Sequence, residues 1–390
     1  MGFLSEYIGK SMTFDQITTE RKAQLSALSA ARGGRDVLVY AADFMKQGPP
    51  IGIDYSDLQP IADQLANLHG QAIDVILETP GGAGEVAEDI VRMLHDKYQT
   101  VAFIIPGWAK SAGTIMAMAG NEILMGSTSA LGPIDAQNVS QGKQFSADAF
   151  LEGLEKIKNE TVKAGALNRA YIPILQGISP GEIQAAQNAM KFSEVLARDW
   201  LAKYKFKDWT AHSTTGQPVT AQQRRGRARQ IARVLCNHRR WLTHGRSLRI
   251  GDLQEMGLKI TNYETLAGCA EPIARYHALL LMTFQTTIDR NIYKVFETPK
   301  SQVYRQAIFT QVPAATPAAG AVKAAFDFKC PSCGTDHKIQ ANLAPGQTLD
   351  PGNLAFPLDN QFKCPACGTV SDLSPHRAQI EAQTGKKVVP

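Results

Sequence analysis

Two glycine-containing segments of the 390-residue chain have residues suited to nucleophilic catalysis, at 79–82 (TPGG) and 109–114 (AKSAGT). The consecutive glycines of the first let the backbone turn its N–H groups outward, where no side chain blocks them. In the second, Ser111 is expected to begin a helix among small residues, which leaves its hydroxyl open to a substrate. The N–H groups of Gly82 and Ala112 would then stabilise the oxyanion of an acyl transfer, by about 3 kcal/mol per donor.

Four of the six cysteines form two CPxCG motifs, and these predict a metal site made of Cys330, Cys333, Cys364 and Cys367. Each CxxC turn places two thiolates on one side, so two such turns complete a tetrahedral site for structural Zn²⁺. A redox role would require a thioredoxin-like βαβ context, which a tail of this length lacks. The small unit around these motifs is too short to fold on burial of apolar surface alone, so a metal ion would be needed to stabilise it. We expect His337 not to be a ligand, because four cysteines already fill the site.

The elements that must position the serine and the glycines alternate between strands and helices. Short β-rich segments occur at 36–44, 72–80, 100–107 and 121–126. An apolar stripe of helical spacing separates the second from the third, made of Val86, Ile90, Met93 and Leu94. The small residues that follow Ser111 form a helix between the third and the fourth. This alternation predicts parallel strands joined by right-handed crossovers, hence an α/β fold.

Three segments in this region, 79–94 (TPGGAGEVAEDIVRML), 109–126 (AKSAGTIMAMAGNEILMG) and 129–137 (SALGPIDAQ), resemble the serine dehydrogenase proteinase family. That family is related to signal peptide peptidase A and, more distantly, to the Clp protease and crotonase fold. The close resemblance covers about residues 36–137, and a weaker one lies at 241–260 (WLTHGRSLRIGDLQEMGLKI). It implies a Clp/crotonase-like spiral of ββα units, a nucleophile at Ser111, an oxyanion hole from Gly82 and Ala112, a polypeptide substrate and a homo-oligomer.

The same residues also have an ordinary structural interpretation. A serine that begins a helix most often caps it, and glycine-rich turns also serve close packing or acyl-thioester chemistry. We favour the nucleophile because TPGG precedes Ser111 at the family's spacing and SALGPID follows it.

A nucleophilic serine needs a general base, and no histidine lies between Ser111 and Ala211. A Ser-His-Asp triad in the order of the Clp proteases is therefore disfavoured. Signal peptide peptidase A enzymes use a lysine about 50 residues downstream, and by this resemblance Lys163 is the predicted base, with Lys156 and Lys158 as alternatives. An amine can take this role where desolvation lowers its pKa. His244 lies in the weaker segment of resemblance, and its sequence position assigns it no role.

The chain is too long for one hydrophobic core of ordinary size, so we expect several parts. These are an N-terminal helical segment at 1–35 with a helix at 14–31, a peptidase domain at 36–205, and a helical extension with a basic stretch at 206–310. A Pro/Ala-rich linker at 311–325 and a zinc ribbon with its tail at 326–390 follow. The last helix of the extension is expected to reach about residue 293.

Positive charge is concentrated in one stretch of the chain. Residues 221–250 contain nine Arg and no Asp or Glu, whereas the whole chain has a formal net charge of +5. Apolar residues recur there at near-helical spacing, so we favour a surface helix whose arginine stems cover apolar surface. Nucleic acid is the alternative partner of this stretch, which we do not favour.

Composition excludes several classes of protein. With 44% hydrophobic and 20% charged residues the chain is neither disordered nor fibrous. It has no run of 18 apolar residues and no secretory signal, and its few cysteines indicate a reducing compartment. The sequence therefore predicts a cytoplasmic serine endopeptidase with a Ser-Lys dyad and no transmembrane segment. The alternative is a noncatalytic scaffold that binds nucleic acid or protein through the zinc ribbon and the Arg-rich helix.

Overall fold

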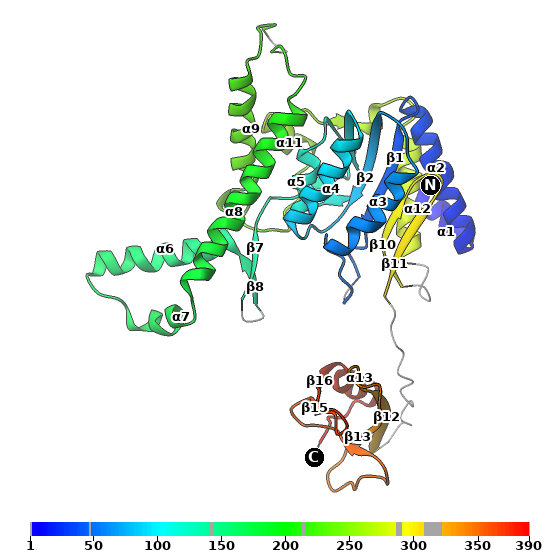
Figure 1. Cartoon of the computed structure of the whole chain (residues 1–390), viewed down its shortest axis with the longest axis vertical. Helices are drawn as coiled ribbons and strands as arrows, with labels where there is room; N and C mark the ends of the chain where they lie inside the picture. The colour runs from blue at the N-terminus through cyan, green and yellow to red at the C-terminus, as the bar shows by residue number, and fades with distance from the viewer. Residues whose placement is uncertain are drawn as a thin grey trace. The chain divides into compact units, whose positions relative to one another are not determined.

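The computed structural model describes residues 2–46, 48–140, 143–212, 215–285, 291–307 and 322–389. The chain divides into two compact units, residues 1–307 and 308–390, and each has its own hydrophobic core (Figure 1). Most of the expected linker at 311–325 lies outside the described residues, and its last three residues belong to a strand of the second unit. None of the helices described in these ranges is long and apolar enough to cross a membrane.

The first unit is built on a mixed seven-stranded sheet, which confirms the α/β class. Its strand order is β11-β10-β1-β2-β3-β5-β9. The bounds are β1 Asp36–Ala42, β2 Ala72–Glu78, β3 Thr100–Ile105, β5 Glu122–Met125, β9 Thr261–Asn262, β10 Ile292–Glu297 and β11 Gln302–Gln306. The strands from β1 to β9 in this order are parallel, whereas β10 and β11 are antiparallel additions at the β1 edge. The four strands expected from the sequence are β1, β2, β3 and β5.

Helices cover both faces of this sheet, so its strands are buried on both sides. Alternate residues of β1 show the two faces: Leu38 and Tyr40 join the larger core, and Val37 and Val39 join the other. The larger core contains α3 (Leu58–Ala66), α4 (Gly84–Lys97) and α5 (Ala112–Met118). The opposite face is covered by α2 (Phe14–Ala31), which has the bounds predicted for it, and α12 (Ala270–Gln285).

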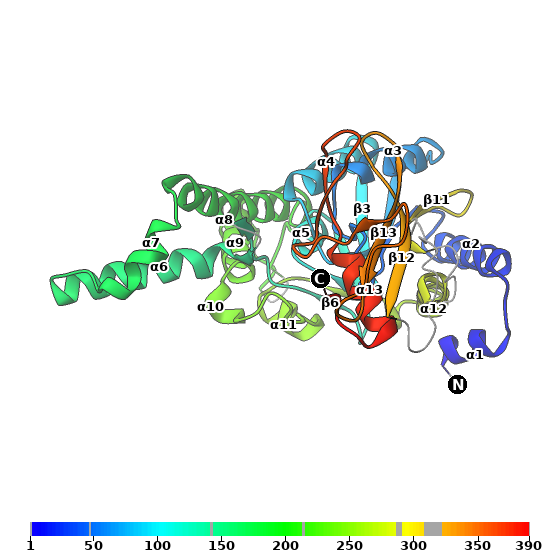
Figure 2. The ribbon, with the colours of Figure 1, turned by 90° about the horizontal axis from the view of Figure 1, so that it is seen from below.

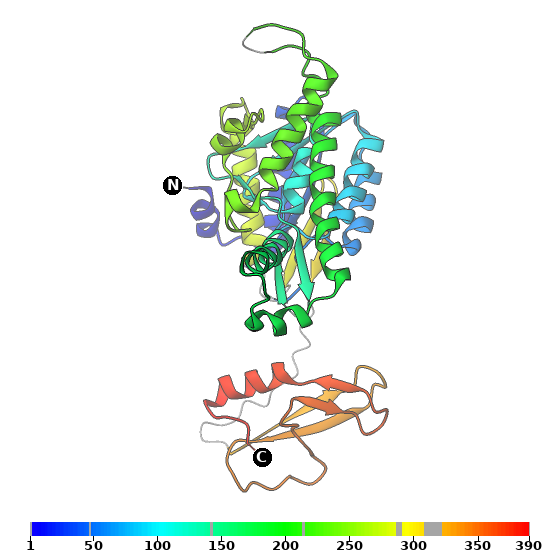
Figure 3. The same cartoon turned by 90° about the vertical axis from the view of Figure 1, so that its left-hand side faces the viewer.

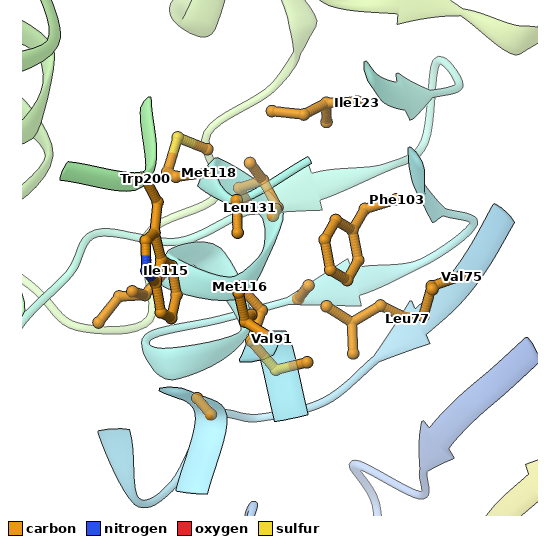
Figure 4. Packing of buried hydrophobic residues seen from close by; sticks show 14 of the residues in the cluster. Val75, Leu77, Val91, Phe103, Ile115, Met116, Met118, Ile123, Leu131 and Trp200 are labelled. Carbon is orange, nitrogen blue, oxygen red and sulfur yellow. The ribbon is translucent and has the colours of Figure 1, made fainter. Parts of the chain in front are cut away.

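Helix α5, which follows the candidate nucleophile, is buried along its whole length. Figure 4 shows its residues Ile115, Met116 and Met118 within the larger core, together with Phe103 of β3 and Trp200 of α8. A glycine is required in this helix, because a Cβ on Gly113 would come within 2.5 Å of the Thr79 side chain. The small residues after Ser111 thus allow the helix to lie directly against the end of β2.

After the nucleophile region the chain forms a helical projection and returns. Helix α6 leads away from the sheet, α7 turns at its far side, and α8 leads back to the body (Figures 1 and 2). Helix α9 then lies along α8, as Figure 3 shows from another side. The bounds in this part are β4 Trp108–Ala109, β6 Ala130–Leu131, β7 Gln137–Ser140, β8 Lys143–Ser146, α6 Ala147–Ala164, η2 Arg169–Tyr171, α7 Ile172–Gln176, α8 Pro180–Trp200, η3 Leu201–Lys205, α9 Ala221–Leu235, α10 His238–Trp241 and α11 Ile250–Glu255.

The end of the first unit differs from the sequence expectation. The helix expected to reach residue 293 ends at Gln285, and residues 292–306 form β10 and β11. Strand β10 pairs with β1 and β11 pairs with β10, so the end of the expected helical extension completes the main sheet. The local sequence pattern did not predict these strands, because β10 pairs with residues of β1 that lie about 250 positions away in the chain. The remaining elements are α1 Phe3–Gly9, η1 Tyr55–Asp57 and η4 Tyr263–Thr265.

The second unit is small and β-rich. Strands β12 (Lys323–Lys329), β13 (Asp336–Asn342) and β14 (Leu354–Ala355) form one sheet. Strands β15 (Gln361–Lys363) and β16 (Val370–Asp372) form a hairpin, and helix α13 (Ser374–Thr384) follows. Four phenylalanines contribute to its core: Phe326, Phe356 and Phe362 are buried, and Phe328 packs against the cluster. This core is too small to stabilise the unit by burial alone.

Candidate active site and metal centre

The two glycine-containing segments lie side by side at the carboxyl end of β2. Thr79 forms a parallel bridge with Ala109, with its N–H donating to the Trp108 carbonyl at 3.0 Å and its own carbonyl accepting from the Lys110 N–H at 2.9 Å. A Cβ on Gly81 would lie only 2.6 Å from the Ser111 Cβ. With φ of +103°, Gly81 also has a backbone conformation that other residues rarely adopt. Glycine is therefore required where the turn passes the serine.

Ser111 itself has a strained backbone, with φ of +51° and ψ of −117°. It precedes the first residue of α5, but its side chain makes no capping hydrogen bond. This removes the ordinary interpretation of the residue as a helix cap. Among the described residues its hydroxyl has no hydrogen-bond partner, and the residue is only half-buried. A strained serine with an uncommitted hydroxyl at a strand-to-helix turn is the arrangement found at nucleophile elbows.

Two backbone donors lie beside this hydroxyl. The residues on both sides of Gly82 form hydrogen bonds with Ile53. The Ile53 N–H donates to the Gly81 carbonyl at 2.7 Å, and the Ala83 N–H donates to the Ile53 carbonyl at 2.9 Å. Within the described part of the chain, the Gly82 N–H has no acceptor. The Ala112 N–H is the first of α5 and has no intrahelical acceptor either. Both donors are thus available to an oxyanion.

A buried ionic network holds the segment that pairs with this turn. The Lys294 ammonium on β10 is 1% exposed and donates to the Gly52 carbonyl at 2.6 Å. It also contacts both carboxylate oxygens of Asp57 at 2.8 Å, and Tyr40 donates to the same carboxylate at 2.6 Å. Gly52 precedes Ile53, so the network fixes the strand against which Gly82 is placed.

Replacing Lys294 by methionine is expected to lower the free energy of unfolding by about 3–5 kcal/mol, because Asp57 would remain buried without its cation. Denaturation by urea would measure the change, with Lys22→Met as a control that removes a more exposed lysine of the same unit. A second change, Asp57→Leu, should restore part of the stability in the Lys294→Met background. A loss below about 1 kcal/mol in the single variant would contradict this role for the network.

The side chain of Lys110, the neighbour of Ser111, contacts two segments that are far apart in the chain, at Leu131 and at 246–247. Its ammonium donates at 3.1 Å to the carbonyls of Leu131 and Arg246 and to the Ser247 hydroxyl. Burial lowers its pKa to about 8, with a smaller contribution from the charge of Arg249. The segment at 246–247 is therefore held directly beside the residue that precedes the candidate nucleophile.

This contact brings an acid and two histidines to the same end of the sheet. Asp135 is buried, and its Oδ2 lies 3.6 Å from His244 Nδ1 and 3.5 Å from His238 Nδ1. The Ser146 hydroxyl donates to its other oxygen at 2.7 Å. Burial alone would raise the pKa of Asp135, but these neighbours outweigh it and lower the pKa. A carboxylate beside an imidazole is the usual orienting pair of a serine nucleophile.

Sequence reasoning left His244 without a role because its partner lies more than 100 residues upstream. The signals that would have identified it are the weaker resemblance at 241–260 and the Asp within SALGPID. The structure shows how this segment is anchored: Trp241 is 5% exposed and its Nε1–H donates to the Val234 carbonyl at 2.7 Å. Leu248 and Leu131 form an antiparallel bridge in which the backbone N–H of each residue donates to the carbonyl of the other.

The three lysines considered as bases lie on α6. Lys163 is the second-last residue of this helix and is exposed, as are Lys156 and Lys158. Lys156 and Lys163 line a shallow surface groove with Glu152 and Arg239. In the described part of the chain, no contact joins any of the three to Ser111. Within a single chain, the structure therefore does not bring the predicted dyad together.

The four predicted zinc ligands meet in the second unit. Their Sγ atoms all lie within 4.8 Å of one another, and the closest pairs are Cys330–Cys367 at 3.6 Å and Cys333–Cys364 at 3.8 Å. Four sulfurs at about 2.3 Å from a tetrahedral zinc ion are separated by about 3.8 Å, so the cluster fits this metal. His337 Nε2 lies 3.2 Å from Cys364 Sγ, where it contacts a ligand rather than adding a fifth.

Comparisons with known proteins support the resemblance stated above. Residues 65–223 match the family model of the ClpP-like SDH-type serine proteinase. Two uncharacterized proteins of Methanocaldococcus jannaschii are similar to the chain. MJ1495 is 33% identical over 90 residues, 23% of this chain and 31% of that protein. MJ0137 is 28% identical over 156 residues, 39% of this chain and 50% of that protein.

Among solved structures, a membrane-bound stomatin-specific protease, 1510-N, in complex with a substrate peptide has 20% sequence identity and a TM-score of 0.23, over 36% of this chain and 51% of that one. The chain spans between about a third and a half of the curated relatives it matches. The family match at residues 65–223 agrees with the resemblance seen in the sequence, includes Gly82 and Ser111, and is to a family of serine proteinases.

Proposed function

We propose that the protein is a serine endopeptidase in which Ser111 attacks the scissile carbonyl. The observation that carries this proposal is the strained, uncapped Ser111 packed against the Gly81 turn. As the carbonyl oxygen becomes negative, the N–H groups of Gly82 and Ala112 stabilise it, and removal of one such donor costs roughly 3 kcal/mol. The family match over residues 65–223 supports the same chemistry.

For the general base we propose His244, oriented by Asp135. Because Nδ1 of His244 faces the carboxylate, Nε2 is the nitrogen left to take the Ser111 proton and to return it to the leaving amine. The buried Asp135 is held by Ser146 and stabilises the imidazolium that forms. The contacts of Lys110 support this assignment, since they join Arg246 and Ser247, close to His244 in the chain, to the residue that precedes Ser111.

The Ser-Lys dyad remains the alternative mechanism. In a homo-oligomer, which the resemblance implies, the exposed end of α6 could bring Lys163 to the serine of another subunit. The two mechanisms differ in which single residue is indispensable, so matched variants distinguish them.

We expect His244→Ala to lower kcat for an unfolded protein substrate by about 10³-fold or more, and Lys163→Ala to leave it within about twofold. Steady-state hydrolysis by the two purified variants would measure this, with far-UV circular dichroism to check folding. The reverse outcome, a loss in Lys163→Ala and none in His244→Ala, would replace our base by the lysine. Asp135→Asn should show a large loss in kcat only if the histidine is the base.

A groove of about 490 Å³ begins at Asp135 and lies between α6, α8 and α9. We propose it as the binding site for the polypeptide substrate, because Asp135 of the proposed catalytic pair lines it. The other parts of the proposal follow from the resemblance and the composition: a ββα spiral, subunits assembled into a homo-oligomer, a cytoplasmic location, and a zinc ribbon at 326–390 with Zn²⁺ held by the four cysteines.

A further inference from the structure

The first unit has a strongly basic groove that the proposed catalysis does not use. This groove, of about 720 Å³, lies between the end of α8 with η3 and the beginning of α9. One acidic residue, Asp199, lines it together with six basic residues: Arg198, Lys203, Lys207, Arg224, Arg225 and Arg229. The excess of five positive charges equals the formal net charge of the whole chain. The rest of the chain is neutral in sum, although it includes the other six arginines of residues 221–250.

Most of these cations have no carboxylate partner. Arg198 pairs with Asp199 at 2.7 Å, and Arg224 donates to the Lys207 carbonyl at 2.6 Å. Among the described residues, none of the other four side chains, those of Lys203, Lys207, Arg225 and Arg229, has a carboxylate oxygen within 4.0 Å. These positive charges also act on His95 of α4. The pKa of His95 is lowered mainly by burial, and the charges of Lys203 and Lys207 lower it further.

The start of α9 makes the groove more positive still. Ala221, its first residue, lines the groove, so the positive end of the helix dipole faces it. The first turn has no acidic residue and is followed at once by Arg224 and Arg225. Cations at this end of a helix are unfavourable because the helix dipole is positive there. A helix used only for packing would be more stable with acidic residues there, and an anion in the groove would offset this unfavourable charge.

We propose that this groove binds the phosphate backbone of a nucleic acid strand, without selecting its base sequence. Guanidinium groups bind phosphate through two parallel hydrogen bonds, and N–H groups at a helix start bind it as well. No aromatic residue is among the described residues that line the groove, so bases have no stacking platform. The site would hold nucleic acid on a peptidase; it does not replace the catalytic role.

The test is fluorescence anisotropy of a labelled 20-nucleotide single strand with the full-length protein at several salt concentrations. Four unpaired cations predict that log K falls with log salt with a slope of about −3. The variant Arg225→Glu/Arg229→Glu should bind at least about tenfold more weakly at 100 mM salt, with a slope of about −1.4. Both residues are exposed, so the variant should stay folded, with a midpoint of thermal unfolding no lower than that of the wild type.

The matched control is Arg92→Glu/Arg169→Glu, which changes two exposed arginines elsewhere in the same unit and should bind like the wild type. Ser111→Ala should also bind normally, so loss of hydrolysis and loss of nucleic acid binding are separable. Three results would overturn the proposal: no binding at 50 mM salt, an unchanged slope in the groove variant, or competition by poly-L-glutamate as effective as that by unlabelled strand. The last would indicate a site for acidic polypeptides instead.

Discussion

Replacement of Ser111 by alanine is expected to lower kcat for peptide hydrolysis by about 10⁴-fold or more while the protein stays folded. The effect is large because removal of the Ser111 hydroxyl removes the proposed nucleophile itself. The substitution should cost little stability, since Ser111 makes no capping bond and alanine is strained to a similar degree at φ of +51°. Hydrolysis of an unfolded protein substrate, followed with excess enzyme, measures the loss.

Labelling by a serine-directed phosphonate gives an independent readout of the same residue. The probe should label the wild type and the control Ser26→Ala, which lacks only an exposed hydroxyl on α2. It should not label Ser111→Ala. Unchanged hydrolysis by the purified Ser111→Ala variant would rule out this nucleophile, and a wild type that neither hydrolyses peptides nor reacts with the probe would favour the noncatalytic scaffold.

Replacement of Cys364 by serine is expected to unfold the second unit and to remove its zinc. Structural zinc contributes about 10–16 kcal/mol to small domains, far more than the buried apolar core of residues 322–389 can supply. Cys364 is 2% exposed, and contact with Thr369 lowers the pKa of its partner Cys367 to about 6, as suits a thiolate ligand. Metal analysis of the purified full-length protein should give one zinc per wild-type chain and about a tenth of that in the variant.

Hydrogen exchange would locate the effect of this substitution. Protection should be lost over β12 to α13 and retained over the main sheet, because the two units have separate cores. The control Cys236→Ser removes a thiol of the first unit and should retain one zinc. A zinc content well below one in the wild type, or full zinc in Cys364→Ser, would contradict the Cys₄ site.

The parts of this protein that the sequence predicted are those specified by local pattern. Helix α2 has the bounds expected from the sequence, and each of the strands β1, β2, β3 and β5 lies within a short β-rich segment. The zinc cluster was predictable for the same reason, since each CxxC turn fixes two ligands within four residues. Ser111 and Gly82 were also recognisable, because the chemistry of each depends on its immediate neighbours.

The sequence by itself thus determined the α/β class and the cluster of four cysteines, and it supplied the proposed nucleophile with its proposed backbone donors. Only the tertiary structure decided which groups surround that nucleophile. It brought Asp135 to His244, buried Lys294 beneath the Gly52 segment, and gathered the basic residues of α8 and α9 into one groove. These contacts join residues far apart in the chain, and packing of the core selects them from many pairings that local pattern leaves equally allowed. For the same reason the lysine at the expected spacing lies on an exposed helix.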